Sequence, residues 1–260
     1  MNASVNTTAA ANTSSSTSAA VRPTVVLVHG AFADSSSWNG VIARLAARGY
    51  PVVAAANPLR SLSGDAQSVA TVIDSIQGPV VLVGHSYGGA VITTAAAGKP
   101  QVKALVYVAA FAPDTNESAA QLAGQFPGGT LGDALAAPVA LPAGGVDLYI
   151  RPESFWQQFA ADVSAADAAL MAAGQRPITD IALNEATQTV AWKQVPSYFV
   201  YGTGDKNIPA AALGFMAERA GSRKTVVVDG ASHVVMTSQP DAVTALIEEA
   251  AGAAAAGLGR

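Results

Sequence analysis

The sequence predicts an α/β protein with a mostly parallel sheet of six strands or slightly more, helices on both faces, and an inserted, mainly helical segment. Short apolar runs rich in valine and leucine recur along the chain, and stretches with helical periodicity separate them. Apolar runs suit strands covered on both faces, and right-handed strand–helix–strand crossovers make such strands parallel. The alternation stops between residues 115 and 195. We therefore expect a core of residues 22–114 and 196–260, with an insertion at 115–195.

The first half of the core is expected to supply four strands with three helices between them. The β-branched and leucine run Thr24–Val28 predicts the first strand. Gly49 is expected to end the first helix, because glycine tolerates the left-handed conformation there. Apolar residues at helical spacing from Val69 to Ile76 predict the second helix. The expected strands are 24–28, 51–56, 80–83 and 103–110, and the expected helices are 41–48, 65–76 and 90–97.

The second half of the core repeats the same alternation after the insertion. Strands are expected at 197–201 and 225–229, and helices at 210–220 and 241–250. The alanine- and glycine-rich end, residues 252–260, is expected to be frayed. Residues 1–21, rich in serine, threonine and alanine, are expected to form a flexible tail. The basic start and apolar centre of a secretory signal are missing, so we expect a cytoplasmic protein and leave secretion open.

Composition and charge narrow the function classes. With 50% hydrophobic and 12% charged residues, the 260-residue chain can bury a large core. The net charge of −4 offers no basic surface for nucleic acid. The lack of cysteine and the presence of only three histidines argue against a metal site, and we expect no cofactor. No apolar run reaches the roughly 20 residues of a membrane span. A small-molecule substrate is expected, bound by a monomer or homodimer.

The segment Pro79–Ala90 carries the strongest functional signal. A buried-strand pattern stops there at Gly84-x-Ser86-x-Gly88, and a helix-like stretch follows at once. In a strand–G-x-S-x-G–helix arrangement, the serine lies on a sharp, strained turn with its hydroxyl exposed above the sheet. The pattern therefore predicts that Ser86 is a nucleophile.

The base that activates Ser86 is expected to be His233. A serine hydroxyl is a poor nucleophile until a neighbouring base accepts its proton. His85 is adjacent to the serine in the chain, so its side chain should project away from the hydroxyl. His29 lies at the end of a predicted strand and suits a hydrogen-bonding role. His233 follows the last predicted strand, at the edge where parallel sheets bind ligands.

The acid that orients His233 is expected to be Asp205. It follows a predicted strand, and it gives the chain order Ser86, Asp205, His233 that accompanies this kind of nucleophile turn. Asp114, just past another predicted strand, is the alternative acid. We favour Asp205 because the glycines on both sides of Thr203 allow a tight turn, whereas Asp114 suits a cap at the start of the insertion.

The negative charge of a tetrahedral intermediate needs hydrogen-bond donors. One is expected to be the backbone N–H of Tyr87, directly after the nucleophile. The other is expected in the loop after the first strand, with Ala31 as the first choice and Phe32 as the second.

Four motifs in this order, VLVHGAF, VGHSYGG, YGTGDKNIP and DGASHVV, carry a resemblance to a known family. The chain resembles the α/β-hydrolase superfamily, and is similar to the branch with small bacterial esterases, plant methylesterases and hydroxynitrile lyases. The resemblance covers about residues 24–250, apart from the insertion. It implies a triad of Ser86, Asp205 and His233, with Ala31 in the oxyanion hole. The implied activity is cleavage of a small neutral carboxylic ester through an acyl-enzyme.

The resemblance also leaves other functions open. Dehalogenases and epoxide hydrolases of the superfamily have an aspartate where Ser86 stands. Hydroxynitrile lyases of the related branch carry threonine in place of Gly30 and lysine in place of Val234, so both residues here favour ester hydrolysis. Cofactor-free haloperoxidases share the triad, and some plant hormone receptors resemble this fold. A perhydrolase, a C–C lyase and a ligand-binding receptor are therefore the alternatives.

The insertion resembles the cap that covers the active site in this superfamily. Aromatic side chains that could wall a pocket there include Phe126, Tyr149, Phe155, Trp156 and Phe159. Of these, Phe126 and Trp156 join Phe32 and Val234 as candidates for the substrate pocket. The insertion holds eight acidic and three basic residues, which disfavours anionic substrates. A gating motion of the insertion is a hypothesis.

Overall fold

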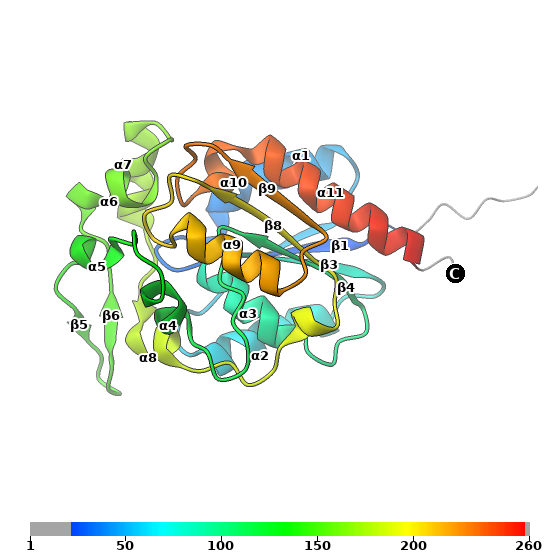
Figure 1. Ribbon diagram of the computed structural model, residues 1–260, viewed down its shortest axis with the longest axis horizontal. Coiled ribbons are helices and arrows are strands. Elements are labelled where there is room, and N and C mark those ends of the chain that lie inside the picture. Colours follow the sequence, from blue (N-terminus) through cyan, green and yellow to red (C-terminus); the bar gives the residue numbers. More distant parts are fainter. Residues whose placement is uncertain (1–21, 258–260) are drawn as a thin grey trace, which may run out of the picture.

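Six strands form one sheet in the order β2-β1-β3-β4-β8-β9, in a computed structural model that describes residues 22–257 (Figure 1). Every neighbouring pair is parallel, which confirms the predicted architecture. The predicted tail, residues 1–21, lies outside the described residues, as do residues 258–260. The strands are β1 (Thr24–Val28), β2 (Val52–Ala55), β3 (Val80–His85), β4 (Val102–Val108), β8 (Ser197–Gly202) and β9 (Lys224–Val228).

Burial explains why the inner strands are continuous apolar runs. Every residue of β3 and of β8 is buried, and so is every residue of β1 after Thr24. β9, at the edge of the sheet, has no buried residue. Both faces of the inner strands are therefore core, and β-branched side chains pack well on such a pleated surface.

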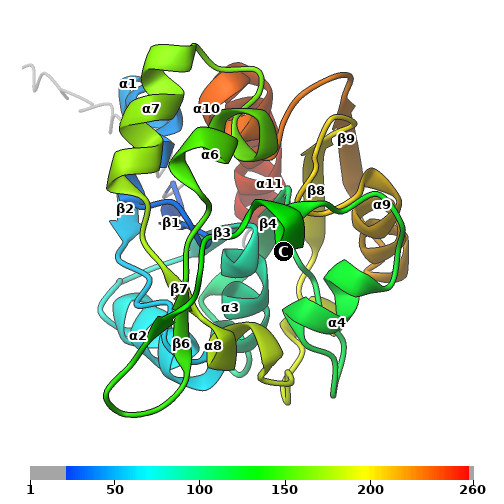
Figure 2. The ribbon, with the colours of Figure 1, turned by 90° about the vertical axis from the view of Figure 1, so that its left-hand side faces the viewer.

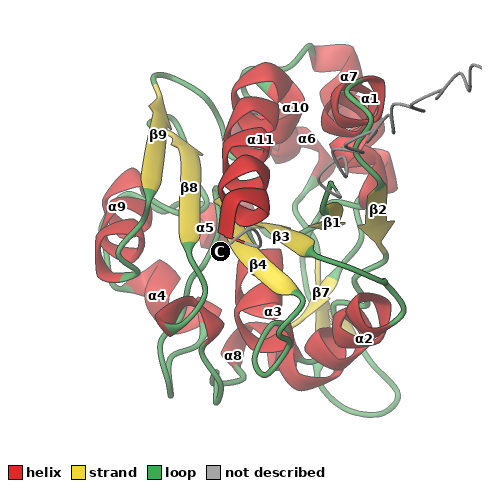
Figure 3. Ribbon diagram, turned by 90° about the vertical axis from the view of Figure 1, so that its right-hand side faces the viewer, coloured by secondary structure: helices red, strands yellow, loops and turns green. Residues whose placement is uncertain are grey.

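Helices cover both faces of this sheet (Figures 1 and 3). Helices α1 and α11 lie on one face and contact each other, while α2, α3 and α9 lie on the opposite face. The main helices are α1 (Asn39–Ala47), α2 (Leu62–Asp74), α3 (Tyr87–Ala95), α9 (Ala210–Arg219) and α11 (Pro240–Gly257). Short helical turns are η1 (Ser35–Trp38), η2 (Ala191–Lys193) and α10 (Val235–Ser238). Within residues 22–257, no helix is both long and apolar enough to cross a membrane.

The last helix corrects one expectation. We expected it to end near residue 250 and the chain to fray from residue 252, but α11 continues to Gly257. The added stretch is mostly alanine, which has the highest helix propensity of all residues. Ala250, Ala251 and Ala254 are also buried, so packing against the body adds to that propensity.

The insertion between β4 and β8 combines short helices with a small antiparallel sheet in the order β5-β6-β7. Its helices are α4 (Ala119–Gly124), α5 (Leu131–Ala134), α6 (Pro152–Phe159), α7 (Ala165–Gly174) and α8 (Asp180–Asn184). Its strands are β5 (Val139–Ala140), β6 (Val146–Leu148) and β7 (Ile178–Thr179). The small sheet has no counterpart in the sequence-based expectation, because strands of two or three residues are too short to show a periodic pattern.

The insertion lies over the loops that follow β1 and β2 (Figure 2). The N–H of Phe32, after β1, donates to the Arg176 carbonyl at 2.9 Å. The N–H of Thr179 donates to the carbonyl of Leu59, after β2, at 3.1 Å. Backbone hydrogen bonds thus fasten the insertion to the end of the sheet at which these strands finish.

Candidate active site

The turn from β3 into α3 places Ser86 at the carboxyl end of the central strands. Ser86 has φ 54° and ψ −126°, a strained conformation for a residue with a side chain. Its N–H donates to the Val108 carbonyl at 3.3 Å, and its carbonyl accepts the N–H of Phe111 at 3.1 Å. The neighbouring strand β4 and the loop after it therefore hold the strained turn in place.

Glycines surround Ser86 because backbone segments meet there without room for side chains. A Cβ on Gly84 would lie 2.5 Å from the Gly88 carbonyl oxygen, and one on Gly88 would lie 2.5 Å from the Val28 carbonyl oxygen. A Cβ on Gly30 would lie 2.6 Å from the Cβ of Ser86. Strand β3, helix α3 and the loop after β1 are thus in direct backbone contact around Ser86.

Ser86, His233 and Asp205 form one hydrogen-bonded chain. Nε2 of His233 lies 2.9 Å from Oγ of Ser86, and Nδ1 lies 2.6 Å from Oδ2 of Asp205. The other carboxylate oxygen, Oδ1, accepts the N–H groups of Asn207 and Ile208 at 2.8 and 2.9 Å. All three side chains belong to buried residues, and Ser86 is only 7% exposed.

Donor and acceptor rules place the protons on His233. An ionised carboxylate only accepts hydrogen bonds, so Nδ1 of His233 carries the proton that points at Asp205. Nε2 is then the unprotonated nitrogen, and it can accept the hydroxyl proton of Ser86. This is the tautomer that a general base for serine requires. Within residues 22–257, no three His, Cys, Asp or Glu side chains gather as a metal site would need.

Asp114 lies away from His233. It forms an ion pair with Lys193, and it accepts the N–H of Thr115 at 2.6 Å. Partial burial is the largest single influence and opposes ionisation, but the hydrogen bonds from Lys193 and the Thr115 N–H, together with the charges of Lys193 and Arg219, outweigh it and hold the pKa of Asp114 below its usual value. Of the two candidate acids, the structure thus places Asp205 beside His233.

His85 supports the loop that carries His233. Its Nε2 bonds the backbone carbonyl of His233 at 3.0 Å, and the two rings lie 4.8 Å apart. Burial, and secondly the neighbouring His233, holds the pKa of His85 well below its usual value. His85 is therefore neutral and donates through Nε2. The sequence interpretation placed His85 away from the serine hydroxyl but missed this contact, which joins segments 148 residues apart.

His29 fastens the loop after β1. Its Nε2 accepts the N–H of Asn57 at 3.1 Å, and its Nδ1 lies 2.9 Å from the Gly30 carbonyl oxygen. Burial lowers the pKa of His29, so the ring is neutral and Nδ1 is the donor. These bonds hold the backbone just before Ala31, in keeping with the hydrogen-bonding role expected for His29.

The expected oxyanion donors lie on two sides of Ser86. Tyr87 is the first residue of α3, where backbone N–H groups have no partner within the helix. In the loop after β1, the N–H of Phe32 is engaged by the Arg176 carbonyl at 2.9 Å. That engagement favours Ala31 over Phe32 as the second donor.

A buried tyrosine–carboxylate contact anchors Tyr87. Its hydroxyl donates to Oδ2 of Asp65 on α2 at 2.8 Å, and the N–H of Arg60 donates to Oδ1 at 3.1 Å. Burial raises the pKa of Asp65. Sequence reasoning did not single out Asp65. A signal existed, because Asp65 shares a face of the helix with Val69, four residues later, where an apolar residue is expected.

Phe159 is the aromatic residue of the insertion that reaches the site. Its ring lies 5.1 Å from the His233 ring and packs edge-on against Phe32 at 6.2 Å. Phe155 and Phe159 are four residues apart and share the buried face of α6. That spacing could have selected Phe159 over Trp156.

The other pocket candidates lie in different surroundings. Phe126 packs against Phe215 of α9 at 5.3 Å. Trp156 is 39% exposed, and its indole N–H donates to the Val163 carbonyl at 3.1 Å. Val234 is fully buried directly after His233. Among the described contacts, Phe32 is joined to the site through Phe159, whereas no contact joins Phe126 or Trp156 to it.

The chain is similar in sequence and fold to known proteins. A salicylic acid-binding protein 2 of Nicotiana tabacum is 27% identical over 249 residues, which cover 87% of this chain and 96% of that protein. An alpha-hydroxynitrile lyase of Arabidopsis thaliana is 25% identical over 237 residues, covering 83% and 92%. The crystal structure of polyneuridine aldehyde esterase matches with a TM-score of 0.77 at 23% identity, covering 88% and 99%.

The family described as the alpha/beta hydrolase family matches residues 25–246 of this chain. The match includes the β3–α3 turn, the loop that carries Asp205 and the loop that carries His233. The chain belongs to the alpha/beta hydrolase family.

Proposed function

We propose that this protein is a serine hydrolase that cleaves small, neutral carboxylic esters through an acyl-enzyme intermediate. The hydrogen-bonded chain from Asp205 through His233 to Ser86, with lengths of 2.6 and 2.9 Å, carries the proposal. Relatives and structural neighbours named as esterases support it. The acidic insertion favours substrates without a negative charge.

In the first half of the reaction, Ser86 attacks the ester carbonyl. A bond forms between Oγ and the carbonyl carbon while the hydroxyl proton passes to Nε2 of His233. Asp205 stays ionised and stabilises the resulting imidazolium. The carbonyl oxygen becomes negative and takes hydrogen bonds from the N–H groups of Tyr87 and Ala31. Each such donor contributes roughly 10²–10³ in rate in serine hydrolases.

The intermediate collapses when the bond to the alcohol oxygen breaks. His233 returns its proton to the leaving oxygen, and the acyl group stays on Ser86. A water molecule then attacks the acyl carbon and gives a proton to His233, which passes it to Oγ as the acid leaves. The net reaction consumes one ester and one water and yields one acid and one alcohol.

A lyase reaction is the second candidate, because a relative is named alpha-hydroxynitrile lyase. Gly30 and Val234 favour hydrolysis. A side chain at position 30 would bring its Cβ to 2.6 Å from the Cβ of Ser86, and Val234 is apolar and fully buried. Positions 30 and 234, where the hydroxynitrile lyases of the related branch carry threonine and lysine, thus carry no polar side chain in this chain.

Hydrolysis of p-nitrophenyl esters by the intact protein and by Ser86→Ala tests the proposal. We expect the intact protein to turn over short-chain esters, and Ser86→Ala to lose at least about 10³-fold in kcat. Ser68→Ala, on the exposed side of α2, is the matched control and should keep full activity. A fluorophosphonate should add one label per chain, absent from Ser86→Ala.

If no ester is turned over and Ser86 is not labelled, the hydrolase proposal is wrong. Release of cyanide and an aldehyde from a cyanohydrin would then identify a lyase. Tight binding of a small ligand without turnover would identify a receptor.

A further inference from the structure

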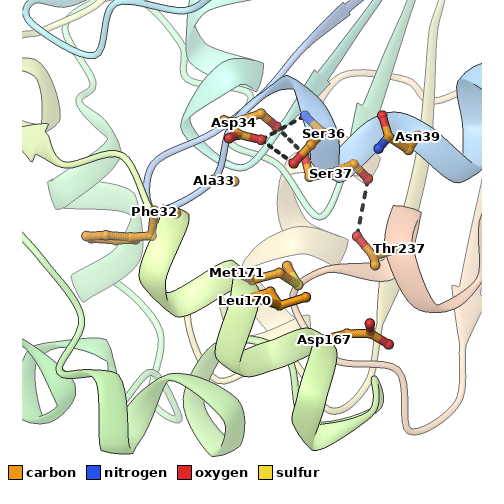
Figure 4. Close-up of a pocket in the computed structure, with 11 residues that line it drawn as sticks. Phe32, Ala33, Asp34, Ser36, Ser37, Asn39, Asp167, Leu170, Met171 and Thr237 are labelled. Atoms are coloured by element: carbon orange, nitrogen blue, oxygen red, sulfur yellow. Dashed lines mark hydrogen bonds between the residues drawn. The ribbon is translucent and has the colours of Figure 1, made fainter.

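A hollow of about 320 Å³ opens between the loop after β1 and helix α7 (Figure 4). Phe32 and Ala33 of the loop and Leu170 and Met171 of α7 supply its apolar wall. Its volume lies at the lower end of the range for small-molecule sites. Ser86 is not among the residues that line it.

The wall formed by α7 is left open to solvent. Leu170 is 73% exposed, and Met171 beside it is half-buried. An apolar group lying between α7 and the loop after β1 would remove both side chains from water, which is favourable because it buries apolar surface. The hollow is thus suited to an apolar group.

Phe32 lies between the hollow and the catalytic residues. Figure 4 shows its ring turned away from Leu170 and Met171, at one end of the lining residues. The ring packs against Phe159, whose own ring lies 5.1 Å from the ring of His233. The contacts from the hollow to His233 thus run through two aromatic rings, of which Phe32 is the one that lines the hollow.

The backbone of Phe32 is held by a hydrogen bond, whereas its side-chain torsions can rotate. The residue has φ 58°, and its N–H is bonded to the Arg176 carbonyl at 2.9 Å. Rotation about the side-chain torsions can move the ring without breaking these contacts. Ser86 is only 7% exposed, and rotation of the Phe32 ring, itself 3% exposed, would open a path to it from the hollow.

The charges of the hollow restrict what can bind. Its polar edge includes the carboxylates Asp34 and Asp167, together with hydroxyl and amide groups, and none of the described residues that line it is basic. The Asp34 carboxylate accepts the N–H of Ser36, and the Asp167 carboxylate accepts the hydroxyl of Ser164. An anionic group would be repelled by both carboxylates.

We infer that this hollow is the subsite for the apolar, uncharged end of the ester, and that Phe32 is the movable partition between it and Ser86. The inference rests on the proposed ester hydrolysis and names its substrate class. The preferred esters carry, on one side of the ester bond, a neutral apolar group of several carbons.

Substitutions of Met171 test the subsite. Met171→Trp fills the hollow and Met171→Ala enlarges it, whereas Ala169→Trp, on the exposed side of α7 outside the lining, is the matched control. Two series of esters are compared, one lengthened in the acyl part and one in the alcohol part. In the series whose lengthened part occupies the hollow, Met171→Trp should lower kcat/KM for the eight-carbon ester at least tenfold and change kcat/KM for the two-carbon ester less than twofold. The ratio of these two kcat/KM values is the length preference. Met171→Ala should raise the ratio of eight-carbon to two-carbon kcat/KM, and Ala169→Trp should leave both kcat/KM values unchanged.

Two further measurements test the partition and the charge rule. Phe32→Ala should raise the ratio of eight-carbon to two-carbon turnover, and Phe32→Trp should lower it. Octanamide should inhibit hydrolysis of p-nitrophenyl acetate at least fivefold more strongly than octanoate. Asp167→Asn should narrow that difference.

The outcomes separate the subsite from the proposed function. If p-nitrophenyl acetate is hydrolysed through Ser86 but Met171→Trp leaves the length preference of both series unchanged, the subsite is wrong and the hydrolase proposal stands. An equal loss for all esters in a Met171→Trp protein with unchanged melting temperature also overturns it. If no ester is hydrolysed, calorimetry of octanamide binding decides: binding that Met171→Trp abolishes supports the hollow as a ligand site, and no binding overturns it.

Discussion

The Asp205 carboxylate has both oxygens committed. Oδ2 faces Nδ1 of His233 at 2.6 Å, and Oδ1 accepts the N–H groups of Asn207 and Ile208. The two backbone donors hold the carboxylate plane, so the bond to His233 has one direction. At the scale of a single residue, this contact sets which nitrogen of His233 faces Ser86.

We predict that Asp205→Asn lowers kcat for p-nitrophenyl acetate by about 10⁴-fold, because an amide can stabilise the wrong tautomer of the histidine. Asp114→Asn is the matched control, since Asp114 is paired with Lys193 instead of His233. It should stay within about twofold of the intact protein. Steady-state kinetics of the two variants would contradict the assignment if Asp114→Asn showed the larger loss.

The buried histidines predict a loss of stability in acid. His85 and His29 are neutral in the folded chain with lowered pKa values, whereas in the unfolded chain they titrate near their usual value of 6.5. Above that pH both states are neutral and stability is complete. As the pH falls below it, only the unfolded chain gains protons, so the free energy of unfolding falls. Each histidine contributes up to about 1.4 kcal/mol per pH unit.

Urea unfolding between pH 5 and pH 8 checks this prediction. His85→Gln keeps a donor for the His233 carbonyl but cannot titrate, so its free energy of unfolding should fall less steeply than that of the intact protein below pH 6.5. Burial raises the pKa of Asp65, so protonation of this carboxyl in acid raises the free energy of unfolding, opposite to the effect of the histidines. Because Asp65 is present in both proteins, its effect cancels in the comparison. Identical slopes would show that His85 is protonated in the folded protein.

At the scale of elements, the turn at Ser86 depends on close backbone contact between α3 and β1. A Cβ on Gly88 would lie 2.5 Å from the backbone oxygen of Val28, which no side-chain rotation can relieve. We predict that Gly88→Ala lowers the free energy of unfolding by about 1–3 kcal/mol or more and removes most esterase activity. Urea unfolding and ester turnover measure the two effects. A fully active and stable Gly88→Ala protein would show that the turn can relax.

Replacing a glycine in α11 by alanine should raise the free energy of unfolding instead of lowering it. Gly252 lies in α11, and a Cβ added to it would meet nothing within 4 Å. Alanine restricts the unfolded chain and has the higher helix propensity, so Gly252→Ala should raise the free energy of unfolding by about 0.5–1 kcal/mol. Ester turnover should not change. A loss of stability would mean that α11 does not continue to Gly257 in solution.

Helix α6 connects the insertion to the loops that carry Asp205 and His233. Phe159 places its ring beside His233, and the side chain of Gln158 donates to Oδ1 of Asn207 at 2.8 Å and to the Lys206 carbonyl at 3.0 Å. Asn207 in turn donates its N–H to Asp205. Any displacement of α6 therefore acts on the surroundings of His233 and Asp205 together.

At the scale of the whole molecule, helix α7 of the insertion is less buried than the central strands of the sheet. Only Ala168 and Ala172 are buried along α7, whereas every residue of β3 is buried and bonded to two neighbouring strands. We predict that backbone amides of α7 exchange with deuterium at least about 100-fold faster than those of β3. Mass-spectrometric exchange at peptide resolution measures this. Equal protection of the two elements would exclude an opening of the insertion.

Much of the fold could be predicted because its signals are local. Apolar runs such as Val80–Val83 and their alternation with helices are properties of neighbouring residues, and they specify strands buried on both faces. The short strands β5, β6 and β7 could not be predicted, because two or three residues carry no periodicity and are held by partners elsewhere in the insertion. The end of α11 was placed too early for a related reason, since burial of its alanines reinforces their propensity.

The sequence by itself determined the α/β architecture, the strained turn at Ser86 and the chain order of serine, aspartate and histidine. Those features are written in patterns of a few consecutive residues, which set the local backbone. Only the tertiary structure decided that Asp205 rather than Asp114 meets His233, that Phe159 rather than Trp156 faces the site, and that Phe32 borders the hollow beside α7. These are contacts between segments far apart in the chain, and packing alone selects which of several suitable side chains meet.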